Sequence, residues 1–91
     1  MKITFSKPYT FEGQEYSEID LDLDSLLGRD VAAAKREWQR QGNYSMLIAA
    51  DVEFCAYLAA KAAGKPLEFM EKLPAKDYCL VAQAVTNFLL V

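Results

Sequence analysis

"YSEIDLDLDSLLGRDVAAAKREW", residues 16–38, contains the change of pattern that decides the fold. Its first part alternates apolar and acidic residues, and this period of two is typical of a β-strand with one buried face. The apolar positions then recur at helical spacing, at Leu27, Val31, Ala34 and Trp38. We therefore expect strands up to Leu23 and helices from Asp30 onward.

Residues 2–23, before this switch, predict a β-hairpin or a small meander. The apolar residues there keep one parity, at Ile3, Phe5, Tyr9 and Phe11. "FEGQEY" supplies the turn, because Gly13 tolerates a positive φ, and Pro8 interrupts its strand because it has no N–H to donate. In the return strand, the acidic residues are expected to form a solvated face: Glu18, Asp20, Asp22 and Asp24. The alternative, a calcium loop, needs a Gly at the bend and a late Glu.

The remaining residues predict helices. Asp30 is the expected N-cap of a helix over Val31–Gln41, which Gly42 ends, and Asn43 or Ser45 is expected to cap a second helix that ends at Gly64. The predicted buried stripe of that second helix is Leu47, Ile48, Cys55, Leu58, Ala59 and Ala62. Asp51 falls inside this stripe, as a catalytic carboxylate or as the cap of a neighbouring element.

A short helix and a long one complete the chain. "PLEFMEKL" gives one or two helical turns, and Pro74 starts the last helix with Asp77 near its positive end. The prediction is an α+β fold in a single domain, residues 1–91. An N-terminal β-hairpin (1–24) is followed by three main α-helices and a short connecting helix (25–91).

The last helix carries the predicted partner-binding residues. Its core stripe is expected to be Tyr78, Val81, Val85, Phe88 and Leu89. Leu80, Ala84 and Val91 extend this stripe on one flank, and Cys79 and Leu90 extend it on the other. A helix that is apolar nearly all round must be covered nearly all round. The surface predicted to meet another chain is therefore Leu80, Ala84, Leu90 and Val91. Two alternatives remain open: a plain core helix, or binding through the helix that contains Trp38.

Composition excludes several classes of function. Ten basic and thirteen acidic residues give a net charge of −3, which argues against nucleic-acid binding. The absence of histidine removes most general-base and metal schemes. Cys55 and Cys79 form no CxxC pair and are expected to be reduced, buried thiols. We predict no catalytic, cofactor-binding or metal-binding residues, and no enzyme.

Further patterns concern a possible phosphopantetheine attachment site and the location of the protein in the cell. Asp24-Ser25-Leu26 is the triplet that carries phosphopantetheine in acyl carrier proteins, but those proteins place it after a long first helix, whereas here it follows a predicted strand. No apolar run is long enough to span a membrane. "MKITFSKPYT" is too polar for the core of a signal peptide. A cytoplasmic protein is therefore expected.

The order of these features resembles the tail assembly chaperones of tailed phages and prophages. The likeness covers nearly the whole chain. After the Pro- and Gly-punctuated hairpin come "LLGRDV", "ADVEFCAYLAAKAAGKP" and "LPAKDYCLVAQAVTNFLL". Each resembles a step of that family in sequence, and their order and spacing add specificity that no single motif has.

The resemblance implies a non-enzymatic chaperone without a cofactor. Such proteins bind the tape measure protein and keep it soluble while tail-tube subunits polymerise round it, so the tail-tube protein is a second expected partner. The expected location is the host cell cytoplasm and not the mature virion. The alternative function is a small structural or regulatory module that forms a homo-oligomer through its C-terminal helix.

Overall fold

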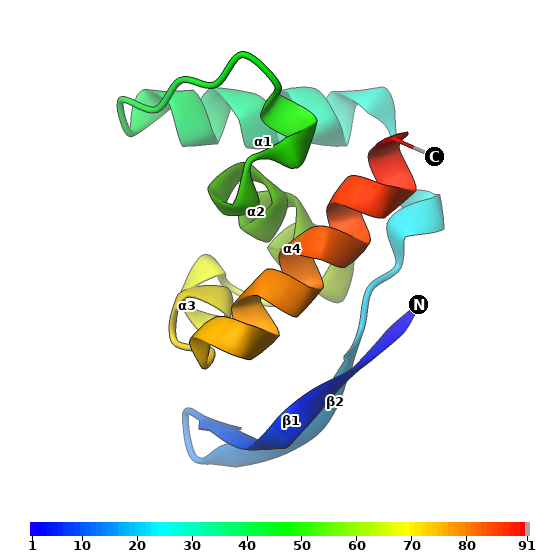
Figure 1. Cartoon of the computed structure of the whole chain (residues 1–91), viewed down its shortest axis with the longest axis vertical. Helices are drawn as coiled ribbons and strands as arrows, with labels where there is room; N and C mark the ends of the chain where they lie inside the picture. Colours follow the sequence, from blue (N-terminus) through cyan, green and yellow to red (C-terminus); the bar gives the residue numbers. More distant parts are fainter. Residues whose placement is uncertain (91) are drawn as a thin grey trace.

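A two-stranded antiparallel sheet lies at one end of the molecule and the helices form the rest (Figure 1). The computed structural model describes residues 1–90, with the elements β1 (Lys2–Phe11), β2 (Gln14–Asp20), η1 (Leu23–Ser25), α1 (Gly28–Arg40), η2 (Ile48–Ala50), α2 (Val52–Ala63), α3 (Leu67–Glu71) and α4 (Ala75–Leu90). The predicted α+β fold is confirmed: a hairpin, three main helices and one short helix.

The hairpin turns at Glu12 and Gly13, which both have a positive φ, 50° and 78°. A turn with two positive φ values matches the right-handed twist of the flanking strands. The four apolar residues of β1 are all buried, as their shared parity predicts: Ile3, Phe5, Tyr9 and Phe11.

A bulge interrupts the ladder around Pro8, where the sequence predicts a break. Thr4 pairs with Glu18 and Tyr9 pairs with Tyr16, so residues 5–8 of β1 lie opposite Ser17 alone. Extra residues in one strand change which side chains of the partner strand face the core. This is why Ile19 is buried and Tyr16 half-buried although they lie three positions apart.

An aromatic cluster holds the hairpin against α3. The rings of Tyr9, Phe11 and Tyr16 lie 5.0–5.2 Å from the ring of Phe69, each edge-on to it. Edge-to-face contact at this distance is a favourable arrangement of aromatic rings. The Tyr9 hydroxyl also donates a hydrogen bond of 2.9 Å to the Phe69 carbonyl oxygen. The short helix α3 is therefore one of the elements that anchor the hairpin.

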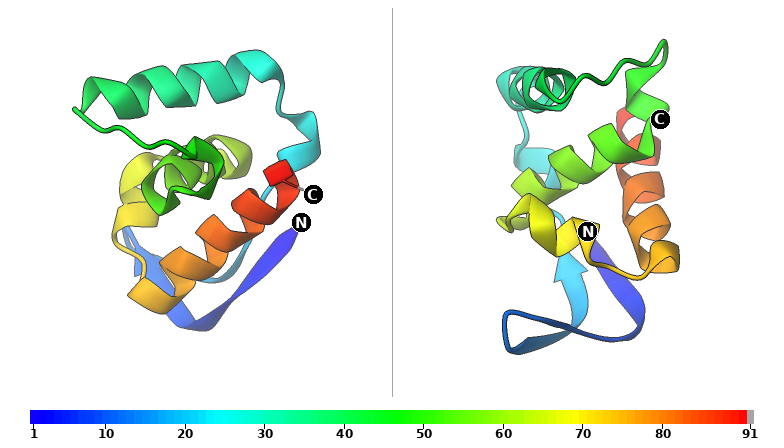
Figure 2. Two further views of the ribbon diagram at one scale, coloured as in Figure 1. Left: turned by 45° about the horizontal axis from the view of Figure 1, so that its top comes forward. Right: turned by 90° about the vertical axis from the view of Figure 1, so that its left-hand side faces the viewer.

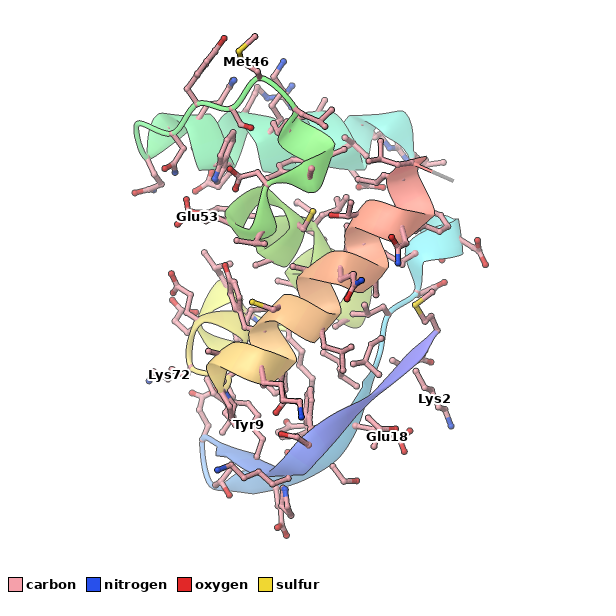
Figure 3. The ribbon with its side chains drawn as sticks, viewed as in Figure 1. Lys2, Tyr9, Glu18, Met46, Glu53 and Lys72 are labelled. Carbon is pink, nitrogen blue, oxygen red and sulfur yellow. The ribbon has the colours of Figure 1, made fainter. Side chains whose placement is uncertain are left out.

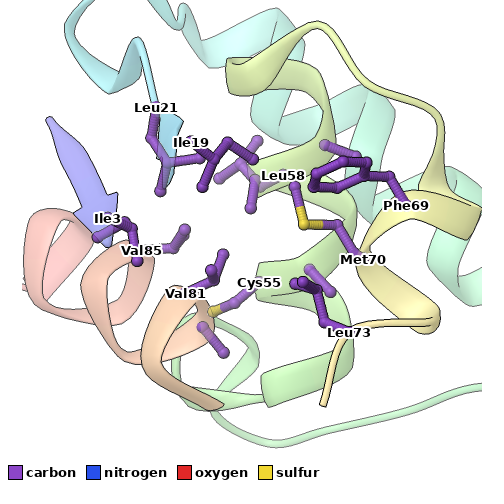
Figure 4. Close-up of a cluster of buried hydrophobic side chains, with 14 of the residues drawn as sticks. Ile3, Ile19, Leu21, Cys55, Leu58, Phe69, Met70, Leu73, Val81 and Val85 are labelled. Atoms are coloured by element: carbon purple, nitrogen blue, oxygen red, sulfur yellow. The ribbon is translucent and has the colours of Figure 1, made fainter. Parts of the chain in front are cut away.

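Helix α2 lies at the centre of the helical part, between α1 and α4 (Figure 2). Small side chains on α2 let the neighbouring helices approach closely, and six of its residues are buried: Phe54, Cys55, Ala56, Leu58, Ala59 and Ala60. Figure 4 shows Val81 and Val85 of α4 turned toward this helix, with Ile3 of the hairpin beside them.

Helix α1 begins at Gly28, so the prediction that Asp30 is its N-cap is wrong. Asp30 lies inside the first turn, and its Oδ2 accepts a hydrogen bond of 2.8 Å from the Leu27 N–H. A carboxylate at this position can satisfy a free N–H at the helix start as well as an N-cap can. Ala34 and Trp38 are buried as expected, but Leu27 is 52% exposed and does not belong to the core.

Helix α2 begins at Val52, later than the sequence predicts, because Asp51 is its N-cap. The Asp51 carboxylate accepts hydrogen bonds from the N–H groups of Glu53 and Phe54. The predicted caps bond locally instead: Asn43 Nδ2 donates to the Trp38 carbonyl, and Ser45 Oγ accepts from the Leu47 N–H. Such local bonds compete with helix formation. Residues 41–51, called the connecting segment below, are therefore helical only in η2.

Candidate partner-binding surface

Helix α4 is the element that carries the predicted binding residues. Pro74 immediately precedes it, and the Pro74 carbonyl accepts a hydrogen bond of 2.9 Å from the Tyr78 N–H. Val81 and Val85 are buried, whereas Phe88, predicted to lie in the core, is 38% exposed. Asp77 lies in the first turn, as expected, but it is also buried, which the charge pattern did not reveal.

The four predicted residues do not form one ridge on α4. Leu80 is 43% exposed, Leu90 is 55% exposed and Ala84 is half-buried, while Val91 lies outside the described residues. At about 100° per residue, Leu80 and Leu90 lie roughly 80° apart around the helix. Leu80 and Ala84 share a ridge that continues to the exposed Phe88, and Leu90 lies on the opposite flank.

The two flanks of α4 have different neighbours. Asp77, which lies on the same side of the helix as Ala84, bonds to β1. Thr86, one turn before Leu90, donates a hydrogen bond of 2.9 Å to the Ala49 carbonyl in η2. The flank of α4 that carries Leu90 therefore contacts the connecting segment at Thr86, whereas the ridge of Leu80 lies toward the hairpin.

The connecting segment exposes apolar side chains that the sequence reasoning missed. Tyr44 is 79% exposed, Met46 is 92% exposed, and Leu47, predicted to be in the core, is 59% exposed. Met46 points away from the body, at the end of the molecule opposite to Tyr9 (Figure 3). The signal that could have found this segment is its composition, because residues 41–50 contain no charged side chain.

The last helix has no charged residue after its first turn. No charged residue occurs from position 78 to 90, although a quarter of the whole chain is charged. The two uncharged segments meet where η2 packs on α4. Six of the nine large apolar side chains that are exposed in residues 1–90 belong to them: Tyr44, Met46, Leu47, Leu80, Phe88 and Leu90.

The alternative binding helix, α1, presents a different surface. Trp38 is buried, and its Nε1 donates a hydrogen bond of 2.9 Å to the Glu53 carboxylate. The exposed positions of α1 are mostly charged, and Arg40 forms an ion pair with Glu37 at 2.8 Å. Trp38 therefore serves the core, and α1 offers little apolar surface to a partner.

The thiols differ in their surroundings. Cys55 is buried, and burial raises the pKa of its thiol, with Asp51 adding to the rise and a hydrogen bond with Thr86 opposing it. Cys79 is exposed, so the expectation that both thiols are buried is wrong for Cys79.

On α4, burial and then Glu53 raise the pKa of Tyr78 to about 12.

The described residues offer little for chemistry on a small molecule. Within residues 1–90, no three Cys, Asp or Glu side chains lie close enough together to hold a metal ion. A cavity of about 390 Å³ opens between α1, α2 and α3, and its lining includes two acidic and two basic side chains: Glu37, Lys61, Lys65 and Glu68. No helix in the described part of the chain is both long and apolar enough to cross a membrane.

Comparison with known proteins identifies the family. The family model described as "Phage tail assembly chaperone proteins, E, or 41 or 14" matches residues 2–90, nearly the whole chain. No curated protein and no solved structure matches the chain. The chain belongs to the family of phage tail assembly chaperone proteins.

Proposed function

We propose that this phage tail assembly chaperone binds the tape measure protein during tail morphogenesis and keeps it soluble. The observation that carries the proposal is the exposure of Leu80 and Leu90, at 43% and 55%, on a helix whose other face closes the core. An exposed apolar helix surface suits a partner that presents the apolar stripe of an amphipathic helix.

The proposed contact residues are Leu80, Ala84 and Leu90, with Val91 added from the sequence pattern. Burying one leucine side chain completely is worth about 1.5–3 kcal/mol. Two such side chains are enough to matter for association after the entropy cost of binding is subtracted. The role is non-enzymatic and is carried out in the host cell cytoplasm. Tail-tube subunits are a second partner, and the chaperone is absent from the mature virion.

The test is co-expression with the tape measure protein of the same phage or prophage. The readouts are the soluble fraction of the tape measure protein and its recovery with a tagged chaperone. Leu80→Asp with Leu90→Asp should abolish both while the chaperone stays folded. Gln14→Asp with Gln39→Asp is the matched control, because it places the same two charges on exposed positions outside α4 and should leave binding intact.

Two further results decide how the co-expression test is interpreted. Val85→Asp should unfold the chaperone, because it places a charge at a fully buried position. A wild-type chaperone that leaves the tape measure protein insoluble would overturn the proposal. If light scattering then showed a homo-oligomer that the Leu80/Leu90 variant loses, the chain would be a module that self-associates through its C-terminal helix.

A further inference from the structure

We infer that the partner-binding surface continues from Leu90 onto the connecting segment, where Tyr44, Met46 and Leu47 receive an amphipathic helix of the same partner. The inference rests on the proposed function and extends its site to a second element. It starts from the exposure of these three side chains, which is 59% or more in each case.

The tip of the connecting segment, residues 44–47, is held in place at both ends. On one side, Asn43 Nδ2 donates a hydrogen bond of 3.0 Å to the Trp38 carbonyl. On the other, the Ala49 carbonyl accepts hydrogen bonds from Thr86 Oγ1 and, at 3.3 Å, from the Cys55 thiol. Hydrogen bonds at both ends restrict the backbone of the tip, and a restricted backbone lowers the entropy cost of binding.

The tip and Leu90 lie on the two sides of one contact, that between η2 and α4. Thr86 bonds to Ala49, which lies two residues after Leu47, and Leu90 follows Thr86 by one helical turn. Figure 2 shows η2 beside the last turns of α4. Because residues 41–50 and 78–90 contain no charged side chain, a partner can cover these parts of both segments without burying an unpaired charge.

The size and chemistry of this surface favour a single helix over a second copy of the chain. A standard interface between two globular proteins involves about 20–30 residues on each side, whereas the tip and Leu90 offer four exposed apolar side chains. A helix binds through three or four apolar anchors at spacings of three and four residues. Met46 adds an unbranched, polarisable side chain that adapts to different apolar neighbours.

The test uses the full chain with the full-length tape measure protein. Tyr44→Ser, Met46→Ser and Leu47→Ser together should weaken binding at least tenfold. Leu27→Ser is the control, because Leu27 is exposed to a similar extent, 52%, but lies outside both uncharged segments, and it should bind as the wild type does. Circular dichroism checks that each variant is folded. If the triple variant unfolds, Met46→Ser alone should still weaken binding at least threefold.

The outcomes separate this inference from the function on which it rests. Binding of the triple variant within twofold of the wild type would overturn the inference and leave the proposed function standing. A wild-type chain that binds no tape measure protein would overturn both. Light scattering of the chaperone alone covers the remaining case: a triple variant that loses a dimer and retains the tape measure protein would assign the tip to a second copy.

Discussion

Ser6 donates two hydrogen bonds to the buried carboxylate of Asp77, which lies 71 residues later in the chain. The Ser6 N–H is 2.9 Å from Oδ1, and the Ser6 hydroxyl is 3.1 Å from Oδ2. Ser6 lies in the bulge of β1, where the backbone N–H has no partner in β2 and needs another acceptor. Asp77 supplies it from the first turn of α4, where the helix end also favours a negative charge.

Removing this carboxylate should destabilise the fold. Asp77→Ala is expected to lower the free energy of unfolding by about 1–3 kcal/mol, because a charge-assisted pair of hydrogen bonds is lost. Ser6→Ala should cost less, since the backbone N–H still donates. Asp24→Ala, at an exposed position, is the control and should stay within about 0.5 kcal/mol of the wild type. Urea unfolding measures all three, and equal losses at Asp77 and Asp24 would contradict the prediction.

The start of α2 gives a second prediction. Asp51→Ala should cost about 1 kcal/mol, because the N–H groups of Glu53 and Phe54 lose their acceptor. Ser45→Ala serves as the comparison, because Ser45 resembles an N-cap in the sequence but lies outside the helix, and its effect should stay below about 0.5 kcal/mol. The ranking is checked by thermal and urea unfolding. A larger loss of stability for Ser45→Ala than for Asp51→Ala would show that α2 begins near Ser45, as the sequence predicted.

The two thiols should react at different rates. In the folded protein Cys79 is exposed, while Cys55 is buried with a raised pKa. Since the thiolate is the reactive form, Ellman's reagent should label one thiol rapidly in the native protein and two in denaturant. Cys79→Ala should remove the rapid phase and Cys55→Ala should retain it. Rapid labelling of the Cys79→Ala variant would show that Cys55 is accessible.

Alkaline pH should destabilise the protein through Tyr78. Its pKa is raised from 10.0 to about 12 by burial and by nearby carboxylates. Between these pH values the unfolded chain has lost the proton that the folded chain still holds, so the free energy of unfolding falls as the pH rises. Below pH 10 this contribution is fully present.

The measurement is urea unfolding at pH 8, 10 and 11.5. Tyr78→Phe should show a shallower fall with pH than the wild type. The fall should not vanish, because burial also raises the pKa of Tyr9 and Tyr57. Tyr44→Phe, which removes a tyrosine that is 79% exposed, should retain the slope of the wild type. Equal slopes for the Tyr78 and Tyr44 variants would show that ionisation of Tyr78 does not cause the loss of stability at alkaline pH.

Local periodicity was sufficient for most of the fold. The parity of Ile3 and Phe5 in β1, and the spacing of Val81 and Val85 in α4, identify buried faces because a strand or helix can turn only one side to the core. The helix starts were less predictable. Asp51 and Ser45 both have side chains that can act as an N-cap. Which of them caps α2 depends on the local hydrogen bonds that the rest of the chain permits.

The candidate site was harder to predict than the fold. Periodicity places Leu80 and Leu90 on different flanks of α4 but does not say what lies beside each flank. Leu47 was assigned to a helix, where its position would be buried, so the exposed connecting segment escaped notice. Pro8 predicted a break in β1, but not the register across it that brings Tyr16 to Phe69, because local periodicity does not say how many residues a bulge leaves unpaired.

The attachment of the hairpin has a consequence for synthesis. Tyr9 and Ser6 bond to partners that follow them by 60 and 71 residues. At about 5–20 residues per second, a ribosome needs roughly 3–14 s to add those partners. A two-stranded hairpin is marginally stable on its own in water. Each newly made copy therefore passes its first seconds with the apolar face of the strand pair uncovered, and factors that bind nascent chains are expected to contact this protein there first.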